Sequence, residues 1–130
     1  MNTPGRPPLS VFIAEDSAAL AEILAELVTV EGRIHLIGTA ASQDEAIADV
    51  LRLQPDVVIL DMQLKPGTGF GVLKATRPAL KASTFIVYSN YVSPEYRQRS
   101  LDLGADYYLD KSRDFAGLVQ LLHEISARRG

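Results

Sequence analysis

Short apolar runs alternate along this chain with segments whose apolar residues recur at helical spacing. The runs are rich in β-branched and aromatic side chains and predict five strands. The central runs are apolar at consecutive positions, which is typical of strands covered on both faces. The predicted strands are Leu9–Ala14, Ile34–Gly38, Val57–Leu60, Thr84–Tyr88 and Ala105–Leu109.

The segments between these runs predict five helices, at residues 17–31, 42–53, 68–79, 93–103 and 115–127. Helical spacing is clearest in the first, whose apolar stripe is Leu20, Ile23, Leu24, Leu27 and Val28. We expect Gly32 to end this helix as a left-handed cap, and Gly104 to close the fourth. Ser42 with Glu45 resembles a capping box, and Pro78 is expected to end or kink the third helix.

Five strand–helix units in succession predict an α/β fold, a mostly parallel sheet with helices on both faces and right-handed crossovers. The unit type repeats, but its sequence does not. In open sheets of this kind, ligands bind beyond the carboxyl ends of the strands. The residues that follow each strand are therefore the candidates for function.

Composition limits the chain to one ordinary domain. It has 130 residues, 47% of them hydrophobic and 22% charged, which argues against a disordered or fibrous protein. The net charge of -3 provides no broad cationic field, so we expect no direct nucleic-acid binding. The absence of cysteine excludes disulfides and thiolate metal sites.

Membrane and targeting signals are also missing, so we expect a soluble, cytoplasmic domain that contacts no membrane. Residues 1–8 carry three of the seven prolines and are predicted to be a disordered lead-in. The domain itself is expected to occupy residues 9–130.

Charged and hydroxyl side chains follow four of the five predicted strands. Glu15 and Asp16 follow the first, Asp61 the third, Ser89 lies at the end of the fourth, and Lys111 follows the fifth. Taken singly, each has an ordinary structural explanation, such as a helix cap, a turn or a solvated lysine. Because parallel strands end at one edge of a sheet, the combination favours a shared acidic site.

Such a cluster requires positive charge. Two carboxylates about 5 Å apart repel by roughly 3 kcal/mol at an effective dielectric constant near 20. Lys111 supplies one cation, and a site built from oxygen ligands suits Mg²⁺ as a second. A carboxylate beside Mg²⁺ and lysine is a suitable nucleophile toward a phosphoryl group.

The motifs at these strand ends resemble those of response regulator receiver domains from two-component signalling, over residues 9–125. The resemblance implies a flavodoxin-like sheet of strand order 2-1-3-4-5. It rests on Val11–Asp16, Val58–Leu64, Gly67–Gly69, Ile86–Asn90 and Gly104–Lys111.

Carried over residue by residue, the resemblance implies that Asp61 is the phosphoacceptor and that Lys111 pairs with the phosphoryl group. Asp16 and Asp61 would give carboxylate oxygens to Mg²⁺. Glu15 would act through a bound water, and Gln63 would offer its backbone carbonyl.

Two further residues match the conformational switch of the family. Ser89 stands at the position of the hydroxyl that moves toward a phosphoryl oxygen. Tyr108, three residues before Lys111, matches the aromatic side chain that rotates inward, and its spacing favours it over the adjacent Tyr107. Core or surface packing is the alternative explanation for Tyr108.

The chain departs from the commonest receiver sequence at several positions. Ser112 follows Lys111 where proline is frequent and a cis bond is usual; before serine, a cis bond costs about 2.5–4 kcal/mol. Pro66 comes one residue later than usual, and Ser89 replaces the commoner threonine. Gln63 and Tyr91 flank the expected phosphoryl site, and we hypothesise that the ring of Tyr91 shields it from water.

The implied function is a phosphorylation-controlled switch rather than an enzyme. A sensor histidine kinase or histidine phosphotransfer protein would donate the phosphoryl group, and an unknown downstream protein would bind the activated form. The chain ends just after the last predicted helix, so we expect a stand-alone receiver without an output domain. A receiver cut from a longer regulator is the alternative.

Two rival functions fit less well. A haloacid-dehalogenase-type phosphatase needs a second aspartate two residues after its nucleophile as a general acid, and this chain has Gln63 there. A pseudo-receiver, which only binds partners, is disfavoured because the acidic residues and Lys111 are all present.

Overall fold

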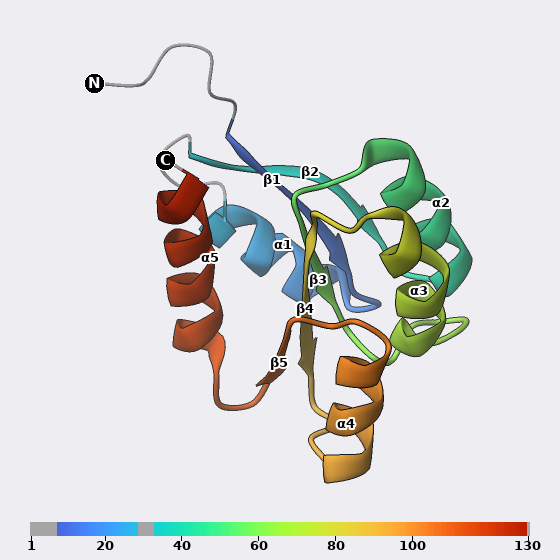
Figure 1. Ribbon diagram of the computed structural model, residues 1–130. Helices are drawn as coiled ribbons and strands as arrows, with labels where there is room; N and C mark the ends of the chain where they lie inside the picture. The colour runs from blue at the N-terminus through green and yellow to red at the C-terminus, as the bar shows by residue number, and fades with distance from the viewer. Residues whose placement is uncertain (1–7, 29–32, 130) are drawn as a thin grey trace.

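The computed structural model describes residues 8–28 and 33–129, and within them strands and helices alternate as the hydrophobic pattern predicts (Figure 1). The strands are β1 (Leu9–Ala14), β2 (Ile34–Ala40), β3 (Val57–Leu60), β4 (Thr84–Ser89) and β5 (Tyr107–Asp110). The α-helices are α1 (Ala18–Val28), α2 (Gln43–Leu53), α3 (Gly69–Thr76), α4 (Pro94–Asp102) and α5 (Phe115–Arg129).

All five strands form one parallel sheet in the order β2-β1-β3-β4-β5, which confirms the predicted fold and strand order. The central strand β3 pairs with β1 and β4 along its whole length. A register shift between Val11 and Phe12 lets β2 accommodate one additional residue opposite β1. Since every strand runs the same way, all five carboxyl ends lie at one edge.

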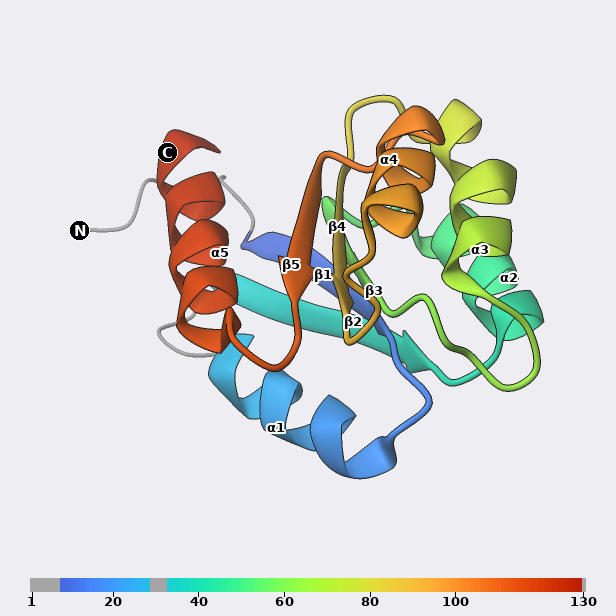
Figure 2. The ribbon, with the colours of Figure 1, turned by 90° about the horizontal axis from the view of Figure 1, so that it is seen from below.

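Two helical layers enclose the sheet. Helices α1 and α5 cover one face and α2, α3 and α4 the other, which is clearest when the molecule is seen from below (Figure 2). Each face has its own core, one centred on Phe12, Val58 and Phe85 and the other on Val11, Ile59 and Ile86. Alternate side chains of a strand thus enter opposite cores, which explains why β3 is buried at all four positions.

Side-chain caps set several helix starts. Ser42 accepts a hydrogen bond from the backbone N–H of Glu45 at 3.3 Å, which confirms it as the N-cap of α2. The second half of a capping box differs here, because the Glu45 carboxylate accepts from the Ser42 hydroxyl, at 3.4 Å, where a capping box uses the backbone N–H. Thr68 and Ser93 are the N-caps of α3 and α4, and their side chains accept the backbone N–H of Gly71 and Tyr96. The predicted Gly32 cap and the predicted lead-in lie outside the described residues, apart from Pro8.

Element ends differ from the predictions by a few residues. Helix α3 ends at Thr76 and continues as the 3₁₀ turn η2 (Arg77–Ala79), because Pro78 lacks the N–H that another α-helical turn requires. Strand β5 begins at Tyr107 rather than Ala105, since the Asp106 carboxylate accepts the N–H of Phe85 at 2.8 Å. In the described part of the chain, no helix is both long and apolar enough to span a bilayer.

Candidate functional site

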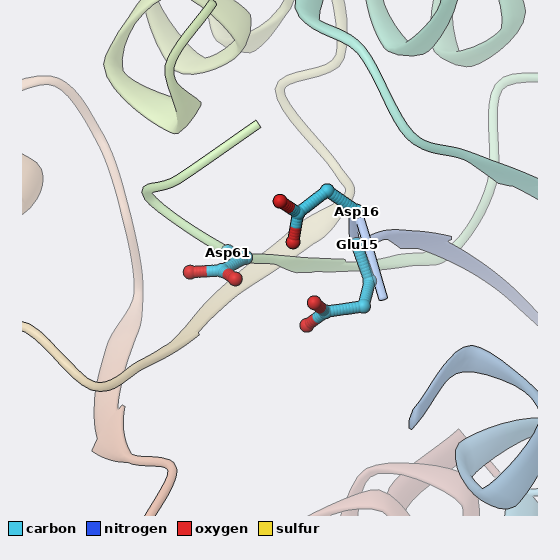
Figure 3. A group of neighbouring side chains, drawn as sticks. All are labelled: Glu15, Asp16 and Asp61. Atoms are coloured by element: carbon cyan, nitrogen blue, oxygen red, sulfur yellow. The ribbon is translucent and has the colours of Figure 1, made fainter. Parts of the chain in front are cut away.

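Three carboxylates meet at the carboxyl edge of the sheet. Glu15 and Asp16 follow β1, and Asp61 follows β3. Each offers one oxygen that lies within 4.8 Å of those of the other two (Figure 3). Glu15 and Asp61 are each only 6% exposed, whereas Asp16 is half-buried. The structure thus brings together the acidic residues that the sequence indicated.

Backbone hydrogen bonds between neighbouring strands fix the carboxylates in place. The N–H of Glu15 donates to the carbonyl of Ala40 at 2.9 Å, and the N–H of Asp61 donates to that of Ala14 at 3.0 Å. Ser17, not Asp16, caps α1 by accepting the N–H of Leu20 at 3.3 Å. The Asp16 side chain is therefore not used as a helix cap.

Lys111 supplies the positive charge at this edge. Its Nζ lies 2.7 Å from Glu15 Oε1 and 2.8 Å from Asp61 Oδ2, so a single ammonium joins residues from the ends of β1, β3 and β5. The N–H of Lys111 donates to the Ser89 carbonyl at 2.9 Å, which anchors the start of this loop. Among the described residues, Lys65–Pro66 is the only cis peptide bond, so the Lys111–Ser112 bond is trans.

Burial and charge pull the ionisation of this cluster in opposite directions. Desolvation raises the pKa of Glu15 above its ordinary value, against the hydrogen bonds from Lys111 and the Ser17 backbone. Burial tends to lower the pKa of Lys111, but its hydrogen bonds and charge interactions with Asp61 and Glu15 outweigh this, so its pKa is raised. One lysine leaves the three carboxylates short of positive charge.

These residues fit a hard divalent cation. The donors are carboxylate oxygens from three residues that lie close to one another, the ligand type that Mg²⁺ prefers. Gln63 belongs to the same site, because its N–H donates to Asp61 Oδ1 at 3.2 Å. Its backbone pairs with Thr68 in an isolated antiparallel bridge, which forms the loop beyond β3.

Ser89 and Tyr108 lie next to each other at the end of β4 and on β5. Ser89 is fully buried, and its hydroxyl accepts the N–H of Tyr91 at 3.2 Å. Tyr108 is 7% exposed and donates its hydroxyl to the Tyr91 carbonyl, whereas Tyr107 packs into the other core. Burial raises the pKa of the Tyr108 phenol. Tyr108 thus occupies an inward position in this structure.

The Gln63 amide donates to the Tyr91 hydroxyl, so the two residues that flank the expected phosphoryl site are in direct contact. The Tyr91 ring stacks at a tilt on Tyr96, with ring centroids 5.5 Å apart, and Tyr96 meets the edge of Phe70 at 5.4 Å. Sequence reasoning missed Tyr96 and Phe70, because no local spacing reveals contacts between α3 and α4.

A separate hollow of about 360 Å³ lies at the opposite edge of the sheet. It is lined by Thr84, Asp106, Tyr107, Ile125 and Arg128. Glu15, Asp16 and Asp61 do not line this hollow.

Comparison with known proteins agrees with this geometry. A family model described as the response regulator receiver domain matches residues 11–123. The uncharacterized transcriptional regulatory protein YvfU of Bacillus subtilis is 29% identical over 116 residues, which cover 89% of this chain and 58% of that protein. A protein-glutamate methylesterase/protein-glutamine glutaminase of Syntrophus aciditrophicus is 28% identical over 134 residues, which cover 93% of this chain and 38% of that protein.

Solved structures give the same result. A chain from the CheX–CheY–BeF3–Mg²⁺ complex of Borrelia burgdorferi superposes with a TM-score of 0.83 at 26% identity, over 92% of this chain and 90% of that one. The chain described here spans less than two thirds of the two curated relatives, and nearly all of this structural neighbour.

Proposed function

The chain belongs to the response regulator receiver domain family of two-component signalling, and we propose that it accepts a phosphoryl group on Asp61. Receiver domains take this group from histidine kinases or histidine phosphotransfer proteins. A carboxylate oxygen of Asp61 attacks the phosphorus of a phosphohistidine. The P–N bond breaks as the P–O bond forms, and the electron pair of the broken bond returns to the imidazole nitrogen. The observation that carries the proposal is the buried Asp61 carboxylate held by Lys111 at 2.8 Å.

The neighbouring residues have distinct proposed roles. Lys111 exchanges its contact with Asp61 for one with a phosphoryl oxygen, because its ammonium already lies within hydrogen-bond distance of the acceptor. Mg²⁺ would be held by the Asp16 and Asp61 carboxylates and the backbone carbonyl of Gln63, with Glu15 acting through a water. When bound, this ion offsets negative charge on the carboxylates and the incoming phosphoryl group.

Phosphorylation then acts as a conformational switch in this proposal. Ser89 moves toward a phosphoryl oxygen and gives up its contact with the Tyr91 N–H. The Tyr108 side chain shifts in response, because its hydroxyl donates to the carbonyl of the same residue, Tyr91. A shift from 1:99 to 99:1 in favour of the active state needs about 5.5 kcal/mol of differential interaction with the phosphoryl group.

A receiver domain is a signalling domain and not an enzyme by itself. We propose that this one works in the bacterial cytoplasm and passes its signal to a downstream protein that binds the remodelled surface of α4, β5 and α5. One form of the proposal is a stand-alone receiver. The other is a receiver within a longer regulator, which the greater length of the curated relatives favours.

Phosphorylation by a small donor tests the proposal directly. With Mg²⁺ and acetyl phosphate, the wild type should gain one phosphoryl group by intact-protein mass spectrometry, and Asp61→Asn should gain none. Asp102→Asn, an exposed aspartate on α4, is the matched control and should react as the wild type does. A modification that persists in Asp61→Asn would contradict the assignment.

A further inference from the structure

Gln43, the first residue of α2, joins that helix to the loop between β3 and α3. Its backbone N–H donates to the carbonyl of Pro66, and its side-chain Oε1 accepts the N–H of Thr68, both at 2.9 Å. Gln43 thus holds the loop at two points, although Thr68 lies 25 residues further along the chain. The ordinary role of a residue at this position, the start of a helix, requires neither contact.

Two glycines make room for the Gln43 side chain. A Cβ built on Gly67 would lie 2.2 Å from the Gln43 Cβ, and one built on Gly71 would lie 2.3 Å from its Cδ. Gly67 also has a φ of 109°, which disfavours any other residue there. The glutamine therefore fills a slot in which its amide has little freedom.

The loop that Gln43 holds is part of the acidic site. Thr68, whose N–H Gln43 accepts, forms the backbone bridge with Gln63. The N–H of Gln63 in turn binds Asp61 Oδ1, and the Gln63 carbonyl is one of the proposed Mg²⁺ ligands. The bridge holds Thr68 opposite Gln63 through two flanking bonds, from the N–H of Leu64 to the Gly67 carbonyl at 3.3 Å and from the N–H of Gly69 to the Met62 carbonyl at 3.0 Å. The loop that Gln43 holds is thus the same loop that places Gln63 beside the phosphoacceptor.

We propose that Gln43 is a positioning residue for the metal and phosphoryl site, an inference that rests on the proposed function. By fixing Thr68, it sets the place of the Gln63 carbonyl relative to the Asp16 and Asp61 carboxylates. Outer residues of this kind orient metal ligands, and their loss typically weakens metal binding tenfold or more. The Thr68 N–H is exposed and turns to water when Gln43 is removed, so the fold itself depends little on the contact.

Calorimetric titration with Mg²⁺ tests the inference in two variants of Gln43. Gln43→Ala removes the Thr68 contact and should weaken Mg²⁺ affinity about tenfold, while its Tm in metal-free buffer stays near that of the wild type. Gln43→Glu keeps an acceptor oxygen for the Thr68 N–H and should bind Mg²⁺ with nearly wild-type affinity. High Mg²⁺ should return the acetyl phosphate reaction rate of Gln43→Ala toward the wild-type rate, because the defect is one of ligand placement.

Gly71→Ala displaces the same side chain without changing Gln43. Alanine suits a helix interior, so the fold tolerates the substitution, while the new Cβ expels the Gln43 amide from its slot. We expect the Mg²⁺ affinity of Gly71→Ala to match that of Gln43→Ala, and the double variant to be no weaker than either. Gly71→Ala also decides the question if Gln43→Ala fails to fold.

These measurements distinguish the role of Gln43 from the existence of the Mg²⁺ site. Wild-type protein that binds Mg²⁺, with Gln43→Ala and Gly71→Ala binding it equally well, overturns the role of Gln43 alone. A Gln43→Ala variant whose Tm falls in metal-free buffer while its Mg²⁺ affinity is unchanged shows a purely structural residue and overturns it too. Wild-type protein that binds no Mg²⁺ overturns the metal site of the proposed function and this inference with it.

Discussion

The single ammonium of Lys111 pairs with two buried carboxylates, those of Glu15 and Asp61, and the pKa of Glu15 is shifted as a result of its burial. Desolvation raises the pKa of Glu15 in the folded state above its unfolded value of about 4.5. An acid whose folded pKa is raised carries no penalty below its unfolded pKa. The penalty develops as the pH rises through 4.5 and is complete above the folded pKa.

Replacing Glu15 with glutamine should therefore stabilise the metal-free protein at pH 7. The gain in the free energy of unfolding should shrink as the pH falls and vanish below about pH 4.5, where Glu15 is protonated in both states. Denaturant unfolding of wild type and Glu15→Gln across a pH series measures this. Equal stability of the two proteins at every pH would contradict the assigned burial cost.

We also expect the ring of Tyr91 to shield the proposed phosphoryl site from water. The residue is 41% exposed, and its hydroxyl is bound by Gln63, so its ring lies beside the proposed phosphoryl site. Removing the ring in Tyr91→Ala should admit water and shorten the aspartyl-phosphate half-life several-fold. Tyr91→Phe keeps the ring and loses only the hydroxyl contact, so its half-life should remain close to that of the wild type.

Intact-protein mass spectrometry over time, after removal of acetyl phosphate, gives these half-lives. An unchanged or longer half-life in Tyr91→Ala would sink the shielding hypothesis. A half-life shortened equally in Tyr91→Phe would assign the effect to the hydroxyl and not to the ring.

At the scale of elements, the start of α3 is packed directly against the phosphoacceptor. A Cβ on Gly69 would lie 2.5 Å from the Asp61 carbonyl oxygen, a backbone atom that cannot move without moving β3. Gly69→Ala should therefore destabilise the protein by about 1–3 kcal/mol, in the range of overpacked sites.

Gly117 in α5 is the matched control for this substitution. The nearest atom to a Cβ there is the Asp114 Cβ at 3.8 Å, an ordinary contact. Gly117→Ala should stabilise α5 by up to about 1 kcal/mol, because alanine is the better helix former. Urea unfolding midpoints of both variants check the opposite signs, and a stable Gly69→Ala would contradict the close approach.

The elements themselves were predictable because their signals are local. Periodicity and capping residues such as Ser42 placed every helix, and consecutive apolar residues identified β3 as a central strand. The predicted element boundaries were wrong where a contact with a residue far along the chain sets the boundary. Strand β5 starts late because Asp106 is bound to Phe85, 21 residues away, and no local pattern contains that contact.

The site at the carboxyl edge was predictable for a different reason. Parallel strand direction places the residues after β1, β3 and β5 at one edge of the sheet, and the strand order implied by the family resemblance puts β1 next to β3. Glu15, Asp61 and Lys111 could therefore be grouped before their contacts were known. The contacts of Gln43 with the loop before α3 were not predictable. They depend on how two helices on one face of the sheet approach each other, which the sequence pattern does not specify.

For the whole molecule, the folded acidic cluster predicts stabilisation by Mg²⁺. An ion that binds only the folded state adds about 2.7 kcal/mol at a concentration one hundred times its Kd. The Tm should therefore rise by several degrees in Mg²⁺ relative to Na⁺ at matched ionic strength. Thermal unfolding followed by circular dichroism measures the shift. The same Tm in both salts would mean that no metal site exists.

The ion pairs of Lys111 join residues that the ribosome translates at very different times. Its partners Glu15 and Asp61 lie 96 and 50 residues earlier, so the acidic edge is translated long before its cation. A ribosome-bound fragment that stops before β5 presents carboxylates without the lysine that holds them. The complete charge pattern of the site therefore forms only after the ribosome has translated β5 and Lys111.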